Sequence, residues 1–186
     1  MMKALNEVKW CGFYVQDLFN IQIGHNVDGN KVDKSNGYYA YITRKESNNG
    51  LDGFVDDKKC FLNKQYPVIT IGNETAEPFV QVYPFYTGTK VNILKCKTNI
   101  SKYALLFITQ CLKKHKSKYS YSYTVNSSRL KKQMIILPTT NNGIPDYAYM
   151  EEYMKEKERL ILERYKIYLS QTIDNQDIKW GGKFVK

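Results

Sequence analysis

Two acidic side chains and a lysine crowd into the segment DGFVDDKK, and this combination could hold Mg²⁺ and activate water for phosphodiester cleavage. The residues are Asp52, Asp57 and Lys59. The segment is also typical of an exposed turn, and its acids lack the wider spacing that brings separate strands together. A small magnesium-dependent nuclease is therefore an alternative, and the sequence assigns no catalytic residue.

The sequence contains no recognisable motif for binding a cofactor or a metal ion. The four cysteines form no CxxC pair and have only two histidines to assist them, so we expect no metal site and reduced, partly buried thiols. A methyltransferase would need a Gly-rich nucleotide loop and an Asn/Asp-Pro-Pro-aromatic box, but the chain contains no GxG and no Pro-Pro. We expect no intrinsic methyl transfer and no cofactor bound by this chain.

Positive charge is concentrated in the middle third of the chain. The formal net charge is +10, from 28 lysines and arginines against 18 acids. From residue 78 to residue 145 there are eleven basic residues and no aspartate or glutamate. The densest part reads KKHKSKYSYSYTVNSSRLKK. This mixture suits nucleic acid, because cations neutralise phosphates while hydroxyls and amides reach base edges.

The expected phosphate anchors are Lys113, Lys114, Lys116, Lys118, Arg129, Lys131 and Lys132. A purely structural alternative is that lysines close a helix and complement its dipole, while alternate tyrosines form one face of a strand. Dipole complementation needs only one or two cations and does not explain the acid-free flanks.

Short strands between turns must carry most of these residues. NVDGN, ESNNGLDG and TGT are turn signals, and YYAYIT, PVITIG and KVNIL between them are typical of strands. Ser101 can cap a helix that runs through Lys116, with apolar residues at helical spacing and lysines in its last turn. We therefore expect an α+β fold in which this helix packs on a sheet.

A long helix should follow the turn-rich linker TTNNGIPD. Residues 147 to about 171 contain no Gly or Pro and would span roughly 35 Å. Apolar side chains recur there at spacings of three, four or seven, which favours coiled-coil pairing; folding back on the same domain is the alternative. The expected dimerisation residues on this seam, which also includes Tyr147, are Met150, Met154, Ile161, Tyr165 and Tyr168.

Two short segments near the two ends of the chain have similar sequences. VKWCGFYV at residues 8–15 and IKWGGKFV at residues 178–185 share Lys, Trp, Gly and Val at equivalent places. Such a match indicates the opening of a second copy of the same unit. We therefore divide the chain into a domain at residues 1–145, a helix at 146–173 and a tail at 174–186.

Membrane association is not expected. The longest apolar run, residues 103–108, is far shorter than the roughly 20 residues that cross a bilayer, and MMKALNEVKW has no signal-peptide core. No basic amphipathic helix with a Trp or Leu face accompanies the charge. We expect a folded, cytoplasmic protein.

Ordered segments along the chain resemble one known family. They read WCGFYVQDLFNIQIG, YYAYITRKESNNGLDGFV, ITIGNE, YPFYTGTKVNILKCK, and SRLKKQMIILP followed by GIPDYAYMEEYMK. In this order they resemble the target-recognition half of Type I restriction-modification specificity (S) subunits, over residues 10 to about 171. One departure is that an acidic residue often follows the Pro-Phe-Tyr motif in such sequences, whereas Thr87, Gly88, Thr89 and Lys90 follow it here.

The resemblance implies a mixed-sheet target-recognition domain, followed by a long C-terminal helix that pairs in an antiparallel coiled coil. It also implies a non-catalytic chain whose partners are double-stranded DNA, a DNA adenine methyltransferase that binds S-adenosylmethionine, and a second half-subunit. A restriction subunit and a related Type II system are left open. The chain would be either a natural half-subunit that dimerises or a part of a two-repeat subunit; a standalone nucleic-acid-binding module is the alternative.

Groove contacts would come from loops and tyrosines. Arginine and asparagine are favoured because each can make paired hydrogen bonds to guanine or adenine. For Tyr86 and Asn49 the structural alternative, a packed ring and a turn residue, is equally open. The expected DNA-binding residues, besides the phosphate anchors, are Arg44, Lys45, Asn48, Asn49, Tyr86, Lys90, Tyr121 and Tyr123.

Overall fold

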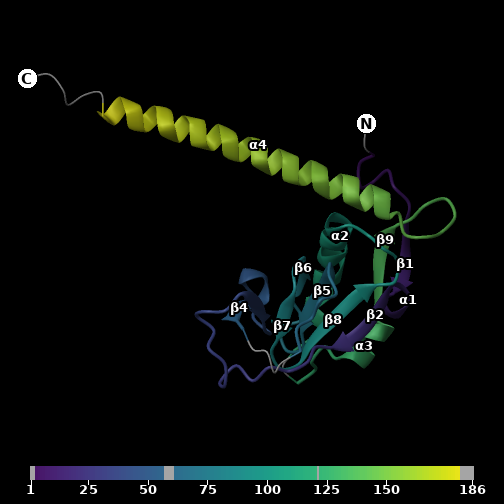
Figure 1. Ribbon diagram of the computed structural model, residues 1–186. Coiled ribbons are helices and arrows are strands. Elements are labelled where there is room, and N and C mark those ends of the chain that lie inside the picture. The colour runs from purple at the N-terminus through teal and green to yellow at the C-terminus, as the bar shows by residue number, and fades with distance from the viewer. Residues whose placement is uncertain (1–2, 57–60, 121, 181–186) are drawn as a thin grey trace, which may run out of the picture.

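The computed structural model describes residues 3–56, 61–120 and 122–180, with the backbone alone for residues 173–180. A strand-rich domain lies under one long helix, α4, which passes over it and continues beyond it (Figure 1). The elements are β1 (Trp10–Tyr14), α1 (Val15–Leu18), β2 (Phe19–Ile23), β3 (Tyr39–Ile42), η1 (Asn48–Gly50), β4 (Leu51–Val55), β5 (Val68–Gly72), β6 (Pro78–Gln81), β7 (Phe85–Thr87), β8 (Val91–Cys96), α2 (Lys102–Lys113), η2 (Lys116–Lys118), α3 (Ser127–Lys132), β9 (Met134–Pro138) and α4 (Tyr147–Trp180).

The strands form three sheets among the described residues. The largest has the order β2-β8-β5-β6 and is antiparallel throughout. A second sheet, β4-β3-β7, is mixed, because β3 pairs antiparallel with β4 and parallel with β7. A two-stranded sheet joins β1 to β9 in antiparallel register, from Trp10 opposite Pro138 to Tyr14 opposite Met134. The expected α+β fold is confirmed.

The two central strands of the four-stranded sheet, β5 and β8, are buried on both faces, which explains why β5 is a nearly continuous apolar run. Ile69 and Leu94 on one face belong to the main core, together with the inner side of α2. Val68 and Ile93 on the other face pack against Phe85 of the second sheet. Successive strand residues point to opposite faces, so both faces of β5 must be apolar.

Helix α2 begins where its capping residue predicts. The Ser101 side chain accepts a hydrogen bond of 3.3 Å from the backbone N–H of Ala104, which satisfies one of the free donors in the first turn. The helix ends at Lys113 rather than Lys116, and the short η2 helix follows it. Its buried face lies against the sheet, as the sequence predicted.

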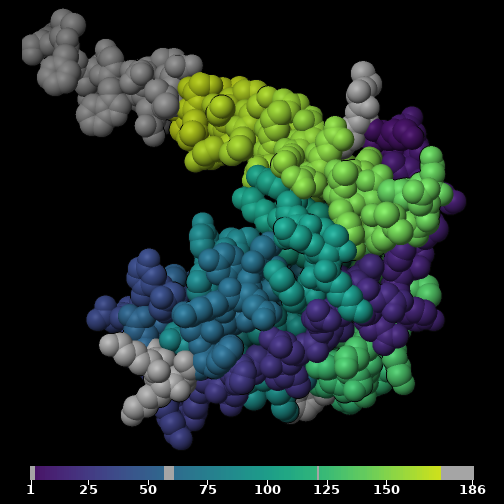
Figure 2. Space-filling view, turned by 45° about the vertical axis from the view of Figure 1, so that its right-hand side comes forward, coloured from purple at the N-terminus to yellow at the C-terminus, as the bar shows by residue number. Residues whose placement is uncertain are grey.

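Helix α4 begins behind a capping aspartate and is longer than expected. The Asp146 carboxylate accepts a 3.0 Å hydrogen bond from the backbone N–H of Tyr149. The helix continues past Gln171 to Trp180. Its first turns lie on α2, and its remainder projects beyond the domain (Figure 2). None of the described helices is both long enough and apolar enough to span a membrane.

Candidate nucleic-acid interface

The loop between β3 and β4, residues 43–50, has a left-handed backbone at three successive positions. The φ angles are 54° at Asn48, 55° at Asn49 and 75° at Gly50. Asparagine and glycine tolerate this region better than other residues, so the sequence Asn-Asn-Gly selects the turn. The Gly50 N–H donates to the Ser47 carbonyl at 3.0 Å, which closes the turn.

The two cations predicted in this loop are already paired. Arg44 forms an ion pair with Glu74, and Lys45 forms one with Asp52. Asp52 also accepts a 3.0 Å hydrogen bond from Lys34. The hydrogen bond from Lys45 lowers the pKa of Asp52 against the opposing effect of burial, with Lys34 adding to the lowering. Arg44 and Lys45 are therefore anchored within the domain as well as partly exposed.

Two of the predicted phosphate anchors meet a buried glutamate. The carboxylate of Glu77, whose side chain is only 6% exposed, pairs with Lys113 and with Lys116 at 2.5 and 2.8 Å. Lys116 also pairs with Glu46 of the β3–β4 loop at 3.0 Å. Burial alone would raise the pKa of Glu77, but the hydrogen bonds from the two lysines outweigh it and the pKa is lowered. Sequence reasoning missed Glu77, which directly precedes the acid-free stretch.

One short turn, residues 73–77 between β5 and β6, contacts four segments, three of them through residues predicted to bind nucleic acid. Glu74 holds Arg44, and Glu77 holds the lysines at the end of α2. The backbone N–H of Asn73 donates to the Lys90 carbonyl at 3.1 Å, while the Asn73 carbonyl accepts from the N–H of Val125 at 2.8 Å. The β3–β4 loop, the β7–β8 turn, the α2–η2 end and the approach to α3 therefore lie around one end of the sheet.

The two asparagines of the β3–β4 loop differ in their surroundings. The side-chain amide of Asn49 donates hydrogen bonds to the Val80 carbonyl and to Gln81, both at 3.2 Å. Asn49 is therefore the turn residue that the structural alternative proposed. Asn48 is exposed, and among the described residues its side chain makes no hydrogen bond.

Tyr86 lies in the core. Its side chain is 5% exposed and packs with Tyr41, Val27 and Val55. The ring of Tyr39 meets it edge-on at a centroid distance of 6.1 Å. The structure thus corrects the expected groove contact, because a ring packed in this way is not presented at the surface.

An aromatic stack orients Arg129 at the start of α3. The Arg129 guanidinium lies 3.8 Å from the ring centroid of Tyr123, which is 50% exposed and stacks in parallel with Tyr119. The guanidinium also donates to the Thr124 carbonyl. Its face is covered, which fixes the direction of its remaining N–H groups. Tyr121 lies outside the described residues.

Five of the predicted lysines are exposed and have no acidic partner within the described part of the chain. Two of them follow the Tyr123–Arg129 stack along α3, which lies on the side of the domain away from α4 (Figure 1). Unpaired cations on the surface are the ones available to neutralise phosphates. These residues are Lys90, Lys114, Lys118, Lys131 and Lys132.

The seam on α4 divides into a docked part and an exposed part. Met150 is fully buried in the core of its own domain, and Met154 packs against the same core. The predicted role of Met150 in dimerisation is corrected, since the domain itself covers it, whereas Met154 is half-buried and its role stays a prediction. The other three, Ile161, Tyr165 and Tyr168, are 65%, 55% and 62% exposed.

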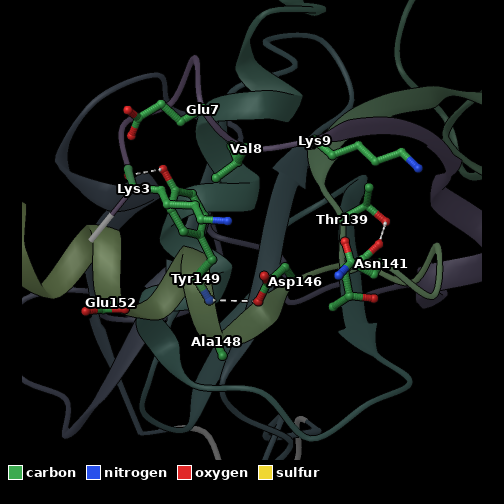
Figure 3. Close-up of a pocket in the computed structure, with 11 residues that line it drawn as sticks. Lys3, Glu7, Val8, Lys9, Thr139, Asn141, Asp146, Ala148, Tyr149 and Glu152 are labelled. Atoms are coloured by element: carbon green, nitrogen blue, oxygen red, sulfur yellow. Dashed lines mark hydrogen bonds between the residues drawn. The ribbon is translucent and has the colours of Figure 1, made fainter. Parts of the chain in front are cut away.

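A polar pocket of about 630 Å³ lies where the N-terminal segment meets the start of α4 (Figure 3). The Tyr149 hydroxyl donates to the Lys3 carbonyl at 3.1 Å, beside the Asp146 cap. Acids and lysines of opposite charge line the pocket together. The hydrogen bond from Tyr149 to Lys3 joins α4 to the N-terminal segment at this pocket.

The nuclease alternative gains no support from the described residues. Asp52 is paired with two lysines, whereas Asp57 and Lys59 lie outside the described residues. No group of three His, Cys, Asp or Glu side chains that could hold a metal occurs within the described ranges. The free thiols include Cys111, whose pKa burial raises to about 11.

Comparison with known proteins identifies one family. The model of the family described as the Type I restriction modification DNA specificity domain matches residues 7–168. The specificity subunit S.BcgI of a Type II restriction enzyme from Heyndrickxia coagulans is 43% identical over 152 residues, which are 81% of this chain and 44% of that protein. The chain thus spans less than half the length of this relative.

Solved structures share the fold. The S subunit of a Type I restriction-modification system from M. genitalium superposes with a TM-score of 0.62 at 16% identity, over 94% of this chain and 46% of that one. The HsdS subunit from Thermoanaerobacter tengcongensis gives a TM-score of 0.57 at 11% identity, over 83% and 38% of the two chains. Both likenesses concern the fold, a strand-rich domain joined to a long helix.

Proposed function

We propose that this chain, which belongs to the family of Type I restriction-modification DNA specificity domains, is a target-recognition unit that binds double-stranded DNA by sequence. It would direct a DNA adenine methyltransferase to its site. In this proposal the methyltransferase binds S-adenosylmethionine and performs the chemistry, and the present chain supplies recognition alone.

The observation that carries the proposal is the convergence at the turn of residues 73–77. Residues predicted from three separate segments to contact nucleic acid meet around this turn, at one end of the sheet, and the segment that leads to α3 contacts the same turn through Val125. A fold that gathers cations and amides from distant segments supports a binding surface better than a charge run on one helix does. The unpaired lysines would position the phosphates, and Arg129 would present its N–H edge to a base or a phosphate.

The exposed part of α4 would pair with the same helix of a second recognition unit. Its apolar side chains are not packed against other described residues. A long helix with exposed apolar positions at heptad-like spacing gains stability by pairing. An antiparallel pair would hold two recognition domains apart, so that each reads half of a bipartite site. The length of the helix would then set the gap between the two halves.

A selection from random duplexes tests the proposal. The full chain, purified together with the methyltransferase encoded nearest to its gene, is mixed with random double-stranded DNA, and the bound fraction is sequenced. We expect enrichment of a bipartite motif with a fixed gap. A bound pool as random as the input would overturn sequence recognition, and failure of the two proteins to copurify would favour a standalone nucleic-acid-binding module.

A further inference from the structure

The β3–β4 loop is fixed at nearly every side chain. Arg44 and Lys45 are ion-paired, Glu46 pairs with Lys116, and Asn49 is hydrogen-bonded. The side chains of Thr43, Ser47 and Asn48 make no such contact within the described residues, and of these three Ser47 and Asn48 are exposed. The loop therefore presents two small polar groups from a rigid frame.

Gln81, at the end of β6, fixes the loop from below. Its side chain is 5% exposed. Its amide N–H groups donate to the Asn49 carbonyl and to the Thr70 hydroxyl, both at 3.0 Å, and its amide oxygen accepts from the side chain of Asn49 at 3.2 Å. Breaking these bonds would leave buried polar groups unpaired, so the frame is costly to distort.

A hollow of about 290 Å³ adjoins this frame. Asn48, Asn49 and Gln81 line it on one side, and Phe54 and Tyr83, which are 44% and 75% exposed, contribute aromatic surface. Asn48 therefore stands beside an open aromatic recess, with its amide unbound. An asparagine side chain can bind the edge of adenine through a matched pair of hydrogen bonds, in which its amide N–H donates to N7 and its amide oxygen accepts from N6–H.

We infer that Asn48 is a specificity-determining residue that reads one adenine edge of the target, and that Gln81 is its positioning residue. This inference rests on the proposed function, because it assigns a role within sequence recognition of DNA. A residue held in a preorganised frame discriminates well, since little conformational entropy is lost when it binds. Neither residue needs to contribute to general attraction for DNA, since neither carries charge.

The test compares wild type with two matched glycine variants, in complex with the methyltransferase. Asn48→Gly removes the amide, and Asn49→Gly removes the neighbouring one; glycine adopts the left-handed conformation of both positions without strain. Affinity is measured for the selected motif and for duplexes in which each base pair is replaced in turn. We expect Asn48→Gly to lose about tenfold or more of the discrimination at a single A·T pair and to keep wild-type discrimination elsewhere.

Gln81→Leu should weaken discrimination at that same base pair, while Thr109→Val serves as the control for loss of a buried hydroxyl away from the loop. The Thr109 hydroxyl bonds to the Leu106 carbonyl within α2. A merely structural Gln81 would instead lower affinity evenly for every duplex. If wild type discriminates between duplexes and Asn48→Gly keeps the wild-type discrimination at every base pair, the inference is overturned and the proposed function stands. If wild type itself shows no preference, both are overturned.

Discussion

The hydroxyl of Tyr103, at the start of α2, donates a 2.8 Å hydrogen bond to the carboxylate of Glu158 in α4. On the N-terminal side of this contact Met150 is fully buried in the domain and Met154 packs half-buried against it, and on the C-terminal side Ile161 is 65% exposed. The contact therefore marks where α4 leaves its own domain. One continuous helix thus has a docked segment and a segment with uncovered apolar side chains.

The docked segment should carry stability. Met150→Ala should lower the free energy of unfolding by about 2–5 kcal/mol, because it empties a fully buried site. Ile161→Ala, at an exposed position, is the control and should change it by less than about 0.5 kcal/mol at protein concentrations where the chain is monomeric. Urea denaturation followed by circular dichroism measures both. Similar losses in the two variants would contradict the division of the helix.

The projecting segment should carry self-association. The double variant Ile161→Glu/Tyr165→Glu places like charges on the seam and should convert an associated form into the monomer without lowering the melting temperature of the domain. Sedimentation velocity at several concentrations measures the change. A wild-type chain that stays monomeric at the highest concentration, in the presence of its DNA and methyltransferase, would refute pairing through α4.

Glu77 should make stability depend on pH in the acid range. Its pKa is lowered from the ordinary value of 4.5, so its contribution is fully present above that value and is lost as the pH falls through the folded-state pKa. Glu77→Gln should therefore show a shallower loss of unfolding free energy below about pH 4.5 than wild type does. Lys113 and Lys116 stay solvated in the variant, since their side chains are 52% and 33% exposed. Identical acid slopes would contradict this assignment.

Unpaired and paired lysines should differ in their contribution to DNA affinity. Replacing Lys131 and Lys132 with alanine should weaken binding to all sequences alike, and the slope of log affinity against log salt should fall by about 0.9 for each lost phosphate contact. Lys113→Ala should have a smaller effect, because Glu77 already neutralises that charge. Fluorescence anisotropy across a salt series gives the slopes. Equal changes for the two variants would mean that the Glu77 pairing does not persist on DNA.

Local sequence signals predicted several of the elements, although α2 ends earlier and α4 later than expected. Ser101 marks the start of α2, Asn-Asn-Gly marks the left-handed turn, and the apolar run at β5 marks a strand buried on both faces. These features depend on capping, backbone conformation and periodicity, which neighbouring residues determine. The resemblance to specificity subunits, drawn from ordered segments, is confirmed by the family model.

Contacts between residues far apart in the sequence could not be predicted from local sequence patterns. Glu77 reaches Lys116 across 39 positions, and Gln81 reaches Asn49 across 32. No spacing rule links such residues, because tertiary packing alone brings them together. The seam on α4 was ambiguous for a related reason. Apolar periodicity predicts that Met150 and Ile161 are buried against a packing partner, but it does not show whether that partner is the same domain or a second chain.

Methylation mapping tests the central claim most directly. The chain is coexpressed with the methyltransferase encoded nearest to its gene, and methylated adenines in the host DNA are located by long-read sequencing, with the methyltransferase alone as control. The account predicts a new split motif with symmetric halves that requires the chain. No new methylation, with both proteins folded and copurifying, would contradict it.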